Sequence, residues 1–321
     1  MTCRRCKHQV VKKFGFYGKG RVQRYRCHLC HATFSEPQQK PLGEHRLDVE
    51  KAVKVLGLMM EGVSIRAIER LTGVHKSTIL ALLVTIGERC REVFNERVRD
   101  VWAGVVQADE LWTFVHTKED HMSDEDPDEW GDAYIWMAIE ARTKLVISYH
   151  VGKRTAADAM MFVKDFSERV HGKLQLTTDG LRDYISAVEE YFGGDIDFAQ
   201  LVKVYGRPKE AGPDWYGPPE VIAAIPTPIT GEPSPWLIST SYVERANLSV
   251  RTHLRRFVRL TNGHSKKLDN LKACVAIYMA WFNFCRVHST LRVTPAMESG
   301  LTDHVWDFVE LLTPNTEHQH L

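Results

Sequence analysis

Four of the seven cysteines lie within the first 30 residues, in two Cys-x2-Cys pairs. The first pair is Cys3 and Cys6, and the second, after a 20-residue spacer, is Cys27 and Cys30. Four thiolates at this spacing can surround one zinc ion tetrahedrally, and the spacer has the length of a small hairpin. Such a short segment cannot bury a sufficient hydrophobic core, so the metal would supply its folding free energy. We therefore predict a zinc ribbon over residues 1–36, with these four cysteines as ligands of a structural Zn²⁺.

Two disulfides are the alternative for the same cysteines. The N-terminus carries no apolar signal segment, and a thiol-reducing compartment disfavours disulfides. The longest nearly apolar run, Ala273–Cys285, has 13 residues, whereas a membrane-spanning helix needs about 20. We expect a cytoplasmic, nucleoid-associated protein with no membrane partner.

The net charge of +1 hides a strong segregation of charge along the chain. Residues 1–40 hold ten basic residues and one acidic residue, and residues 241–300 hold ten basic and three acidic residues. Residues 101–240 between them hold 12 basic and 24 acidic residues. Basic segments on both sides of an acidic middle indicate a nucleic-acid surface that flanks an acidic site.

Residues 47–97 have the pattern of a helical DNA-binding region. Ser64 can cap a short helix that ends near Leu71, Gly73 supplies a turn, and a second helix begins directly afterwards. This layout predicts a helix-turn-helix, whose second helix places its first turn in the major groove of DNA. A helical hairpin without a DNA role is the alternative. The predicted groove-facing residues are His75, Lys76, Ser77 and Thr78.

From residue 101 the apolar period becomes that of strands alternating with helices. Strands are expected at residues 102–112, 134–139, 144–149, 174–178 and 198–205, and helices at 155–170 and 181–192. Residues 206–235 are rich in proline and glycine and predict a long loop or insertion. This order predicts an α/β catalytic domain over residues 101–300 with a mixed five-stranded sheet, followed by a C-terminal tail over residues 301–321.

The stretch Ser241–Lys267 predicts an amphipathic helix with one acidic residue, Glu244, near its start. Its apolar face holds Val243, Ala246, Val250, Leu254 and Phe257. Its basic residues would contact phosphates if a metal ion occupied the acidic position. The candidates for phosphate contact are Arg245, Arg251, Arg255, Arg256 and Arg259.

Three acidic residues are placed to form one site. The first and fourth strands of such a sheet lie side by side, so their ends bring Asp109 and Asp179 together, and the later helix can deliver Glu244. Three carboxylates cannot share a dry site unless cations neutralise them, and oxygen ligands favour Mg²⁺ or Mn²⁺. Glu110 is the competing ligand, although as the strand neighbour of Asp109 it should point to the opposite face.

The order of elements resembles the ribonuclease-H-like core of DDE transposases and retroviral-type integrases. The two cysteine pairs, the segment that begins YVERANLSVRTH, and the tail motif Asn283…His288-Ser-Thr-Leu291…Thr294-Pro-Ala296 resemble bacterial and archaeal insertion-sequence transposases. The resemblance is closest to the insertion-sequence-one family and covers nearly the whole chain. It implies that Asp109 from QADELW, Asp179 from TTDG and Glu244 from YVER are the catalytic, Mg²⁺-binding triad.

The resemblance implies a DNA transposase that cleaves element ends and transfers the 3′-OH strand into target DNA. Two alternatives are a metal-dependent DNA nuclease without strand transfer and a catalytically inactive, transposase-derived DNA-binding regulator. Because a transposase must pair two element ends, we expect a homodimer or higher homo-oligomer on DNA.

Overall fold

The structure of the protein is a computed structural model. It describes residues 2–3, 5–18, 22–35, 42–206, 220–258 and 262–312. The chain divides into two compact units, Met1–Pro41 and Leu42–Leu321. The helix-turn-helix region and the α/β region therefore belong to one unit.

The first unit is a three-stranded antiparallel sheet. Its strands are β1 (Val11–Tyr17), β2 (Val22–Cys27) and β3 (Thr33–Ser35), paired in the order β1-β2-β3. Cys3 and Cys6 precede β1, Cys27 ends β2, and Cys30 lies in the turn before β3. The four cysteines thus lie on two segments, the residues before β1 and the end of β2 with the turn that follows it.

Three helices open the second unit: α1 (Val49–Met60), α2 (Ile65–Thr72) and α3 (Lys76–Arg97). Ser64 caps α2 by accepting a hydrogen bond from the Ala67 amide at 3.3 Å. Gly73 ends the helix with a φ of 69°, a conformation that favours glycine. The helix, turn and second helix predicted from the sequence are therefore present.

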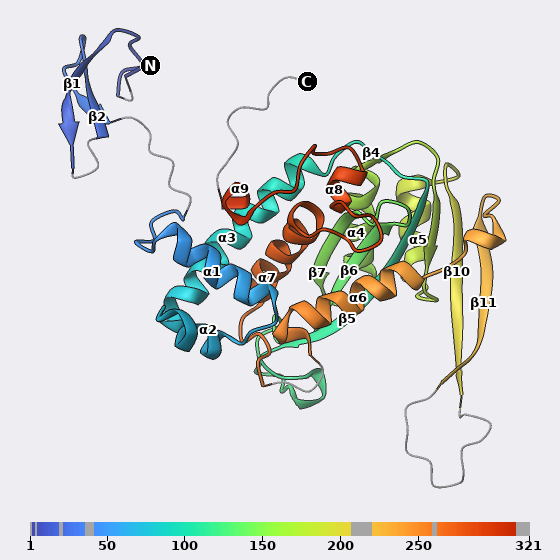
Figure 1. Cartoon of the computed structure of the whole chain (residues 1–321). Coiled ribbons are helices and arrows are strands. Elements are labelled where there is room, and N and C mark those ends of the chain that lie inside the picture. Colours follow the sequence, from blue (N-terminus) through green and yellow to red (C-terminus); the bar gives the residue numbers. More distant parts are fainter. Residues whose placement is uncertain are drawn as a thin grey trace. The chain divides into compact units, whose positions relative to one another are not determined.

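A mixed six-stranded sheet forms the centre of the second unit, in the order β11-β10-β9-β5-β6-β7 (Figure 1). β5 pairs with β6 and β6 with β7 in antiparallel fashion, whereas β9 runs parallel to both β5 and β10. The first and fourth predicted strands, β5 and β9, are neighbours as expected. The strands are β5 (Val105–Val115), β6 (Gly131–Glu140), β7 (Val146–Gly152), β9 (Gln175–Thr178), β10 (Asp197–Gly206) and β11 (Glu220–Thr230), and a separate short pair joins β4 (Val101–Trp102) to β8 (Val170–His171).

The sheet has one strand more than the sequence predicts. The whole proline- and glycine-rich stretch 206–235 was expected to be a long loop or insertion, but its residues Glu220–Thr230 form β11, antiparallel to β10. Pro226 and Pro228 lie within β11, and proline is tolerated in a strand at the edge of a sheet, where one side of the backbone has no partner. The two prolines argued against a strand in the sequence, although the apolar run Val221–Ile225 before them is typical of β-structure.

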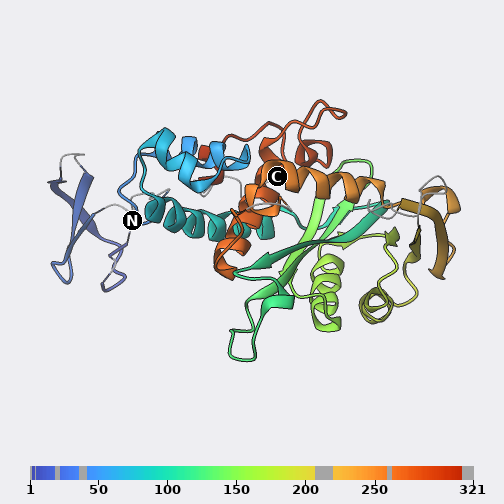
Figure 2. The same cartoon turned by 90° about the horizontal axis from the view of Figure 1, so that it is seen from below.

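Helices cover both faces of the sheet. α4 (Ala156–Ser167) and α5 (Asp183–Phe192) pack together on one face, and α6 (Ser241–His253) crosses the other face over β5 and β6 (Figure 2). The five apolar residues predicted for the stretch 241–267 are at most 6% exposed. However, α6 ends at His253, because Leu254 leaves the helical conformation and a short 3₁₀ turn follows over Arg255–Phe257.

The C-terminal part packs onto the first helices through α7 (Leu268–Ala280), which lies against α3. A π-helical segment, Trp281–Cys285, follows, and then the short helices α8 (Pro295–Glu298) and α9 (Phe308–Leu312). Asn283 is fully buried, and its amide accepts a hydrogen bond from the Val146 amide and donates one to the Val146 carbonyl. Its contacts therefore hold this segment to β7. Among the described residues, no helix combines the length and the apolar character that crossing a bilayer requires.

Candidate metal centres and nucleic-acid interface

The candidate acidic site lies where β9 ends beside β5. Ala108 pairs with Thr178, the last residue of β9, so Asp109 and Glu110 continue along β5 past the end of its neighbour. Asp179 directly follows β9. The pairing of β5 with β9 ends at this point, so Asp109, Glu110 and Asp179 lie just beyond the paired residues.

Asp109, Glu110 and Asp179 each contribute one carboxylate oxygen to a group whose atoms lie within 4.8 Å of one another. Asp109 and Asp179 are brought together as predicted. The side chain of Glu110 does lie on the opposite face of β5 from Asp109. Its cross-strand partner Trp136 shares this face and contacts the Tyr184 ring of α5 at a centroid distance of 5.5 Å. Its carboxylate nevertheless reaches the group, which residue alternation alone did not predict.

These residues fit a divalent cation. Their donor atoms are all carboxylate oxygens, the ligands that Mg²⁺ and Mn²⁺ prefer. The side chain of Glu110 is only 2% exposed, and a side-chain hydrogen bond with Tyr184 favours its charged form.

Burial shifts the protonation of this group. Burial raises the pKa of Asp109 to about 6, and the neighbouring Asp179 carboxylate adds to this shift. Burial raises the pKa of Glu110 to about 8, again with a contribution from Asp179. The site therefore resists carrying all its negative charges unless a cation is present.

A pH dependence of stability follows for the chain without added divalent ions. The folded-state pKa values of Asp109 and Glu110 exceed the ordinary values of 3.8 and 4.5. The folded state therefore holds protons that the unfolded state releases, and this stabilisation is lost as the pH rises from about 4 to about 8. Urea unfolding at several pH values, followed by tryptophan fluorescence, measures this in the second unit alone, because all eight tryptophans lie beyond residue 101.

Glu110→Gln should reduce the loss of stability between about pH 5 and pH 8, because glutamine does not titrate. Asp195→Asn, at an exposed position after α5, is the matched control and should leave the slope unchanged. An equal slope in wild type and Glu110→Gln would contradict the assigned shift.

Glu244 stands at the start of α6 but is not part of the three-residue group. Its Oε1 accepts hydrogen bonds from Thr240 Oγ1 and Lys203 Nζ, and its side chain is 44% exposed. One turn further along α6, Asn247 Nδ2 donates to Asp109 Oδ2 at 2.8 Å. α6 is also fixed to β5 because Gln107 Oε1 accepts from the Tyr242 amide at 2.8 Å. The sequence did not single out Asn247, Gln107 or Lys203.

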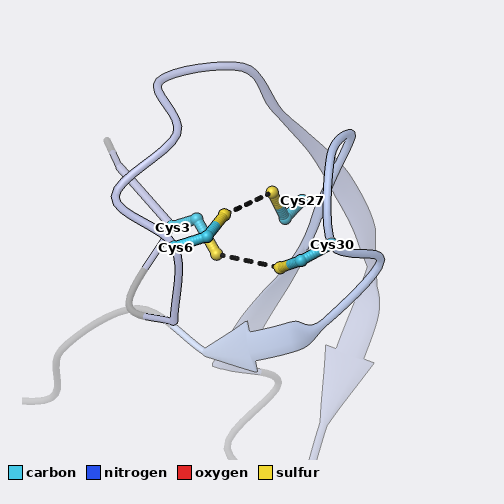
Figure 3. Close-up of side chains that lie close together, drawn as sticks. All are labelled: Cys3, Cys6, Cys27 and Cys30. Carbon is cyan, nitrogen blue, oxygen red and sulfur yellow. Dashed lines mark hydrogen bonds between the residues drawn. The ribbon is translucent and has the colours of Figure 1, made fainter.

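The four N-terminal cysteines converge on one point (Figure 3). Cys3 Sγ lies 3.5 Å from Cys30 Sγ, Cys6 Sγ lies 3.6 Å from Cys27 Sγ, and all four sulfurs lie within 4.8 Å of one another. All four are free thiols. One site with four sulfur ligands is what a tetrahedral structural zinc requires.

The protonation of these thiols also favours a cation. A hydrogen bond from the backbone of Cys6 lowers the pKa of Cys3 to about 6. A backbone hydrogen bond at His8 lowers the pKa of Cys6, but desolvation and the three neighbouring sulfurs outweigh it and raise that pKa to about 12. One thiolate thus opposes the ionisation of the next, and a bound cation removes this opposition.

The four residues predicted to face the groove lie at the start of α3. His75 caps the helix, its Nδ1 accepting from the Ser77 amide at 3.3 Å, and Lys76 opens the helix. His75, Lys76 and Ser77 are exposed and Thr78 is half-buried.

The predicted phosphate-binding arginines fall into two groups. Arg251 donates to the carbonyl oxygens of Phe257 and Trp112, and Arg256 donates to Ser265 Oγ and the Asn270 carbonyl. These contacts hold α6, β5 and α7 together. Arg245 and Arg255 are exposed, and Arg259 lies outside the described residues.

A cavity of about 690 Å³ separates the start of α2 and α3 from the segment after α6. Its lining includes the apolar residues Met59, Leu80 and Leu254. No carboxylate belongs to the described residues that line it, whereas its polar lining includes Arg66, Lys76, Arg255, Arg256, His264 and Lys266. Two predicted DNA-binding segments thus meet at one basic cavity.

The fold and the two clusters define a chain with a four-cysteine unit followed by an α/β unit in which two carboxylates of β5 and one directly after β9 lie close together. A mixed sheet flanked by helices is compatible with a ribonuclease-H-like transposase fold. No family model matches the chain. No curated protein matches it.

Three solved structures show a distant likeness. A chain of the Mos1 strand transfer complex is 14% identical, with a TM-score of 0.20, over 46% of this chain and 57% of that chain. A chain of a pre-cleavage Mos1 transpososome is 12% identical, with a TM-score of 0.20, over 51% of this chain and 62% of that chain. A chain of the piggyBac transposase synaptic complex with hairpin DNA is 12% identical, with a TM-score of 0.37, over 83% of this chain and 70% of that chain.

This chain therefore spans less than two thirds of each of the two Mos1 chains.

Proposed function

We propose that this protein is a DNA transposase that cleaves the ends of an insertion element and joins the 3′-OH strand to target DNA. The observation that carries the proposal is the approach of Asp109, within β5, and Asp179, directly after the end of the neighbouring strand β9. Asp109 and Asp179 would hold Mg²⁺ or Mn²⁺. Bound there, such ions activate an attacking water or 3′-hydroxyl and stabilise the leaving oxygen of a phosphodiester.

Glu244 is proposed as the third acid of this site. It belongs to the same helix as Asn247, which contacts Asp109, and its negative charge contributes to the raised pKa of Asp109. Lys203 now pairs with Glu244. When the site is loaded, Glu244 would exchange this contact for the cation.

DNA is the proposed partner. The basic cavity supports this, because its described lining combines apolar residues with three arginines and two lysines and holds no carboxylate, which suits a phosphate-bearing chain. The cysteine unit is proposed to bind Zn²⁺ and to add a second basic surface. A homodimer or larger assembly on paired DNA ends is also proposed, and light scattering of the DNA complex at monomer mass would contradict it.

The double variant Lys76→Ala/Arg255→Ala should weaken DNA binding at every sequence tested, because both side chains are proposed to contact phosphates. The slope of log affinity against log salt should fall by about 2, one unit for each phosphate that is no longer neutralised. Fluorescence anisotropy with labelled duplex DNA at several salt concentrations measures both quantities. Arg91→Ala, at an exposed arginine of α3 that pairs with Glu88, is the matched control. An unchanged slope would remove these two residues from the DNA surface.

An assay of cleavage and joining tests the function as a whole. The substrate is a linear DNA fragment that carries the inverted repeats flanking the gene, mixed with a target plasmid and Mg²⁺ or Mn²⁺. A transposase nicks the repeat ends and also joins a pre-cleaved end to the plasmid. Cleavage without joining would indicate a nuclease, and DNA binding without either reaction would indicate a regulator.

A further inference from the structure

The loop between β7 and α4 directs one arginine into the acidic group. Arg154 Nε donates to Glu110 Oε2 at 3.3 Å, and Arg154 Nη2 donates to Asp179 Oδ2 at 3.3 Å. The guanidinium therefore bridges two of the three clustered carboxylates. Neither the strand pattern nor the predicted triad points to this residue.

The neighbours of Arg154 hold the loop on both sides. The Lys153 carbonyl accepts from Trp136 Nε1 at 3.0 Å, and Lys153 Nζ donates to the Trp130 carbonyl at 2.6 Å. Thr155 caps α4, accepting from the Asp158 amide at 3.2 Å and donating to Asp158 Oδ2 at 2.6 Å. A residue between two such anchors has little freedom to leave the site.

Gly152 shows how closely this loop is packed. A Cβ at Gly152 would lie 1.9 Å from Asp158 Oδ1 and 2.6 Å from His150 Nε2. These two atoms are themselves paired at 2.8 Å. A side chain at position 152, the last residue of β7, would therefore displace the paired His150 and Asp158 side chains beside the loop.

Both aspartates have an orienting partner from a different element. Asp109 Oδ2 accepts from Asn247, whereas Asp179 Oδ1 accepts from the Leu181 amide at 3.0 Å and its Oδ2 accepts from Arg154. Groups that hydrogen-bond to metal-ligating side chains fix their orientation and raise metal affinity. Arg154 occupies this position for Asp179.

We propose that Arg154 is a positioning residue that orients Asp179 for a divalent cation, and that Glu110 is its buried anchor and not a third ligand. The proposal rests on the proposed metal-dependent function and deepens it. The Glu110 side chain is almost fully buried, whereas Arg154 is 41% exposed and Asp179 is 33% exposed. Glu110 can therefore hold the guanidinium from the buried side, while Asp179 remains accessible to a cation.

Binding of Mn²⁺ to the zinc-loaded full-length chain, followed by the electron paramagnetic resonance of free Mn²⁺, tests this without any catalytic readout. Arg154→Ala should raise the Mn²⁺ dissociation constant about tenfold or more, as the loss of an orienting partner does at other metal sites. Arg154→Lys should also bind more weakly than wild type, because an ammonium cannot bridge two carboxylates as a guanidinium does. Arg142→Ala, an exposed arginine paired with Glu298, is the control.

Glu110→Gln separates an anchor from a ligand. The glutamine oxygen can still accept from Arg154 Nε, so Mn²⁺ affinity should stay close to that of wild type. A loss as large as that of Asp109→Asn would make Glu110 a ligand and overturn its anchoring role. Unchanged affinity in a folded Arg154→Lys or Arg154→Ala variant would overturn the role of Arg154.

The failure of the underlying function looks different. If the wild type binds no Mn²⁺, or if Asp109→Asn leaves its Mn²⁺ binding unchanged, the metal-dependent function itself is wrong. If that binding exists and the Arg154 variants leave it intact, only the present inference falls.

Discussion

Replacing Asp109 or Asp179 with asparagine should slow metal-dependent DNA cleavage about a thousandfold or more. Each carboxylate is proposed to hold a cation that stabilises the transition state by several kcal/mol, and each 1.4 kcal/mol is about a factor of ten in rate. An amide keeps the size of the side chain but loses the charge that binds the cation. Nicking of the fragment with the inverted repeats, measured over time on a gel, gives the rate.

The stability of the Asp109→Asn variant should move in the opposite direction. Burial and the neighbouring Asp179 raise the pKa of Asp109 to about 6, which means that its carboxylate destabilises the metal-free fold at neutral pH. Asp109→Asn should therefore be at least as stable as wild type in the absence of added divalent ions, while it is inactive. Asp195→Asn, at an exposed position, should keep both activity and stability. Full activity in Asp109→Asn would remove the catalytic role of the site.

Replacing Cys27 with alanine should unfold the first unit and leave the second unit folded. Structural zinc contributes about 10–16 kcal/mol in small zinc-binding peptides, more than a three-stranded sheet of this size can supply by burial. Cys27 is buried at the end of β2, so its loss removes both a ligand and the link between the strand and the metal. Zinc content, and the dispersion of amide signals from residues 2–35 in the full chain, measure the effect.

Cys285→Ala is the matched control, because this cysteine lies in the second unit and is only partly exposed. It should retain zinc in full. Limited proteolysis should cut Cys27→Ala within the first unit and leave the second unit resistant. Stoichiometric zinc in the variants of all four N-terminal cysteines would contradict the proposed centre.

Many elements of this fold could be predicted because their signals are local. The spacing of the cysteine pairs, the Ser64 cap and the Gly73 turn depend on residues a few positions apart, and the structure places them as expected. The approach of Asp109 and Asp179 followed from the order of strands, since that order makes β5 and β9 neighbours. β11 was missed because Pro226 and Pro228 are incompatible with a central strand and are tolerated only at an edge, and the sequence does not say which strand is at the edge.

The roles of individual charged residues were harder to predict. Arg251 and Arg255 look alike in the sequence, yet one donates to backbone carbonyls and the other is exposed. Glu110 was expected to point away from Asp109, and its side chain does lie on the other face of β5, but its carboxylate still reaches the same group beyond the last β5–β9 pair. Each outcome depends on what a distant segment places beside the side chain.

The sequence alone determined the spacing of the four N-terminal cysteines, the helix-turn-helix pattern and the neighbouring strands that bring Asp109 and Asp179 together, because periodicity, capping and strand order are encoded over short stretches. Only the tertiary structure decided that Lys203 pairs with Glu244, that Asn247 holds Asp109, and that Arg154 joins Glu110 to Asp179. These contacts link residues 25 to 138 positions apart. A polar side chain accepts many partners of similar energy, so its choice is made by the packing of the backbone and not by its neighbours in sequence.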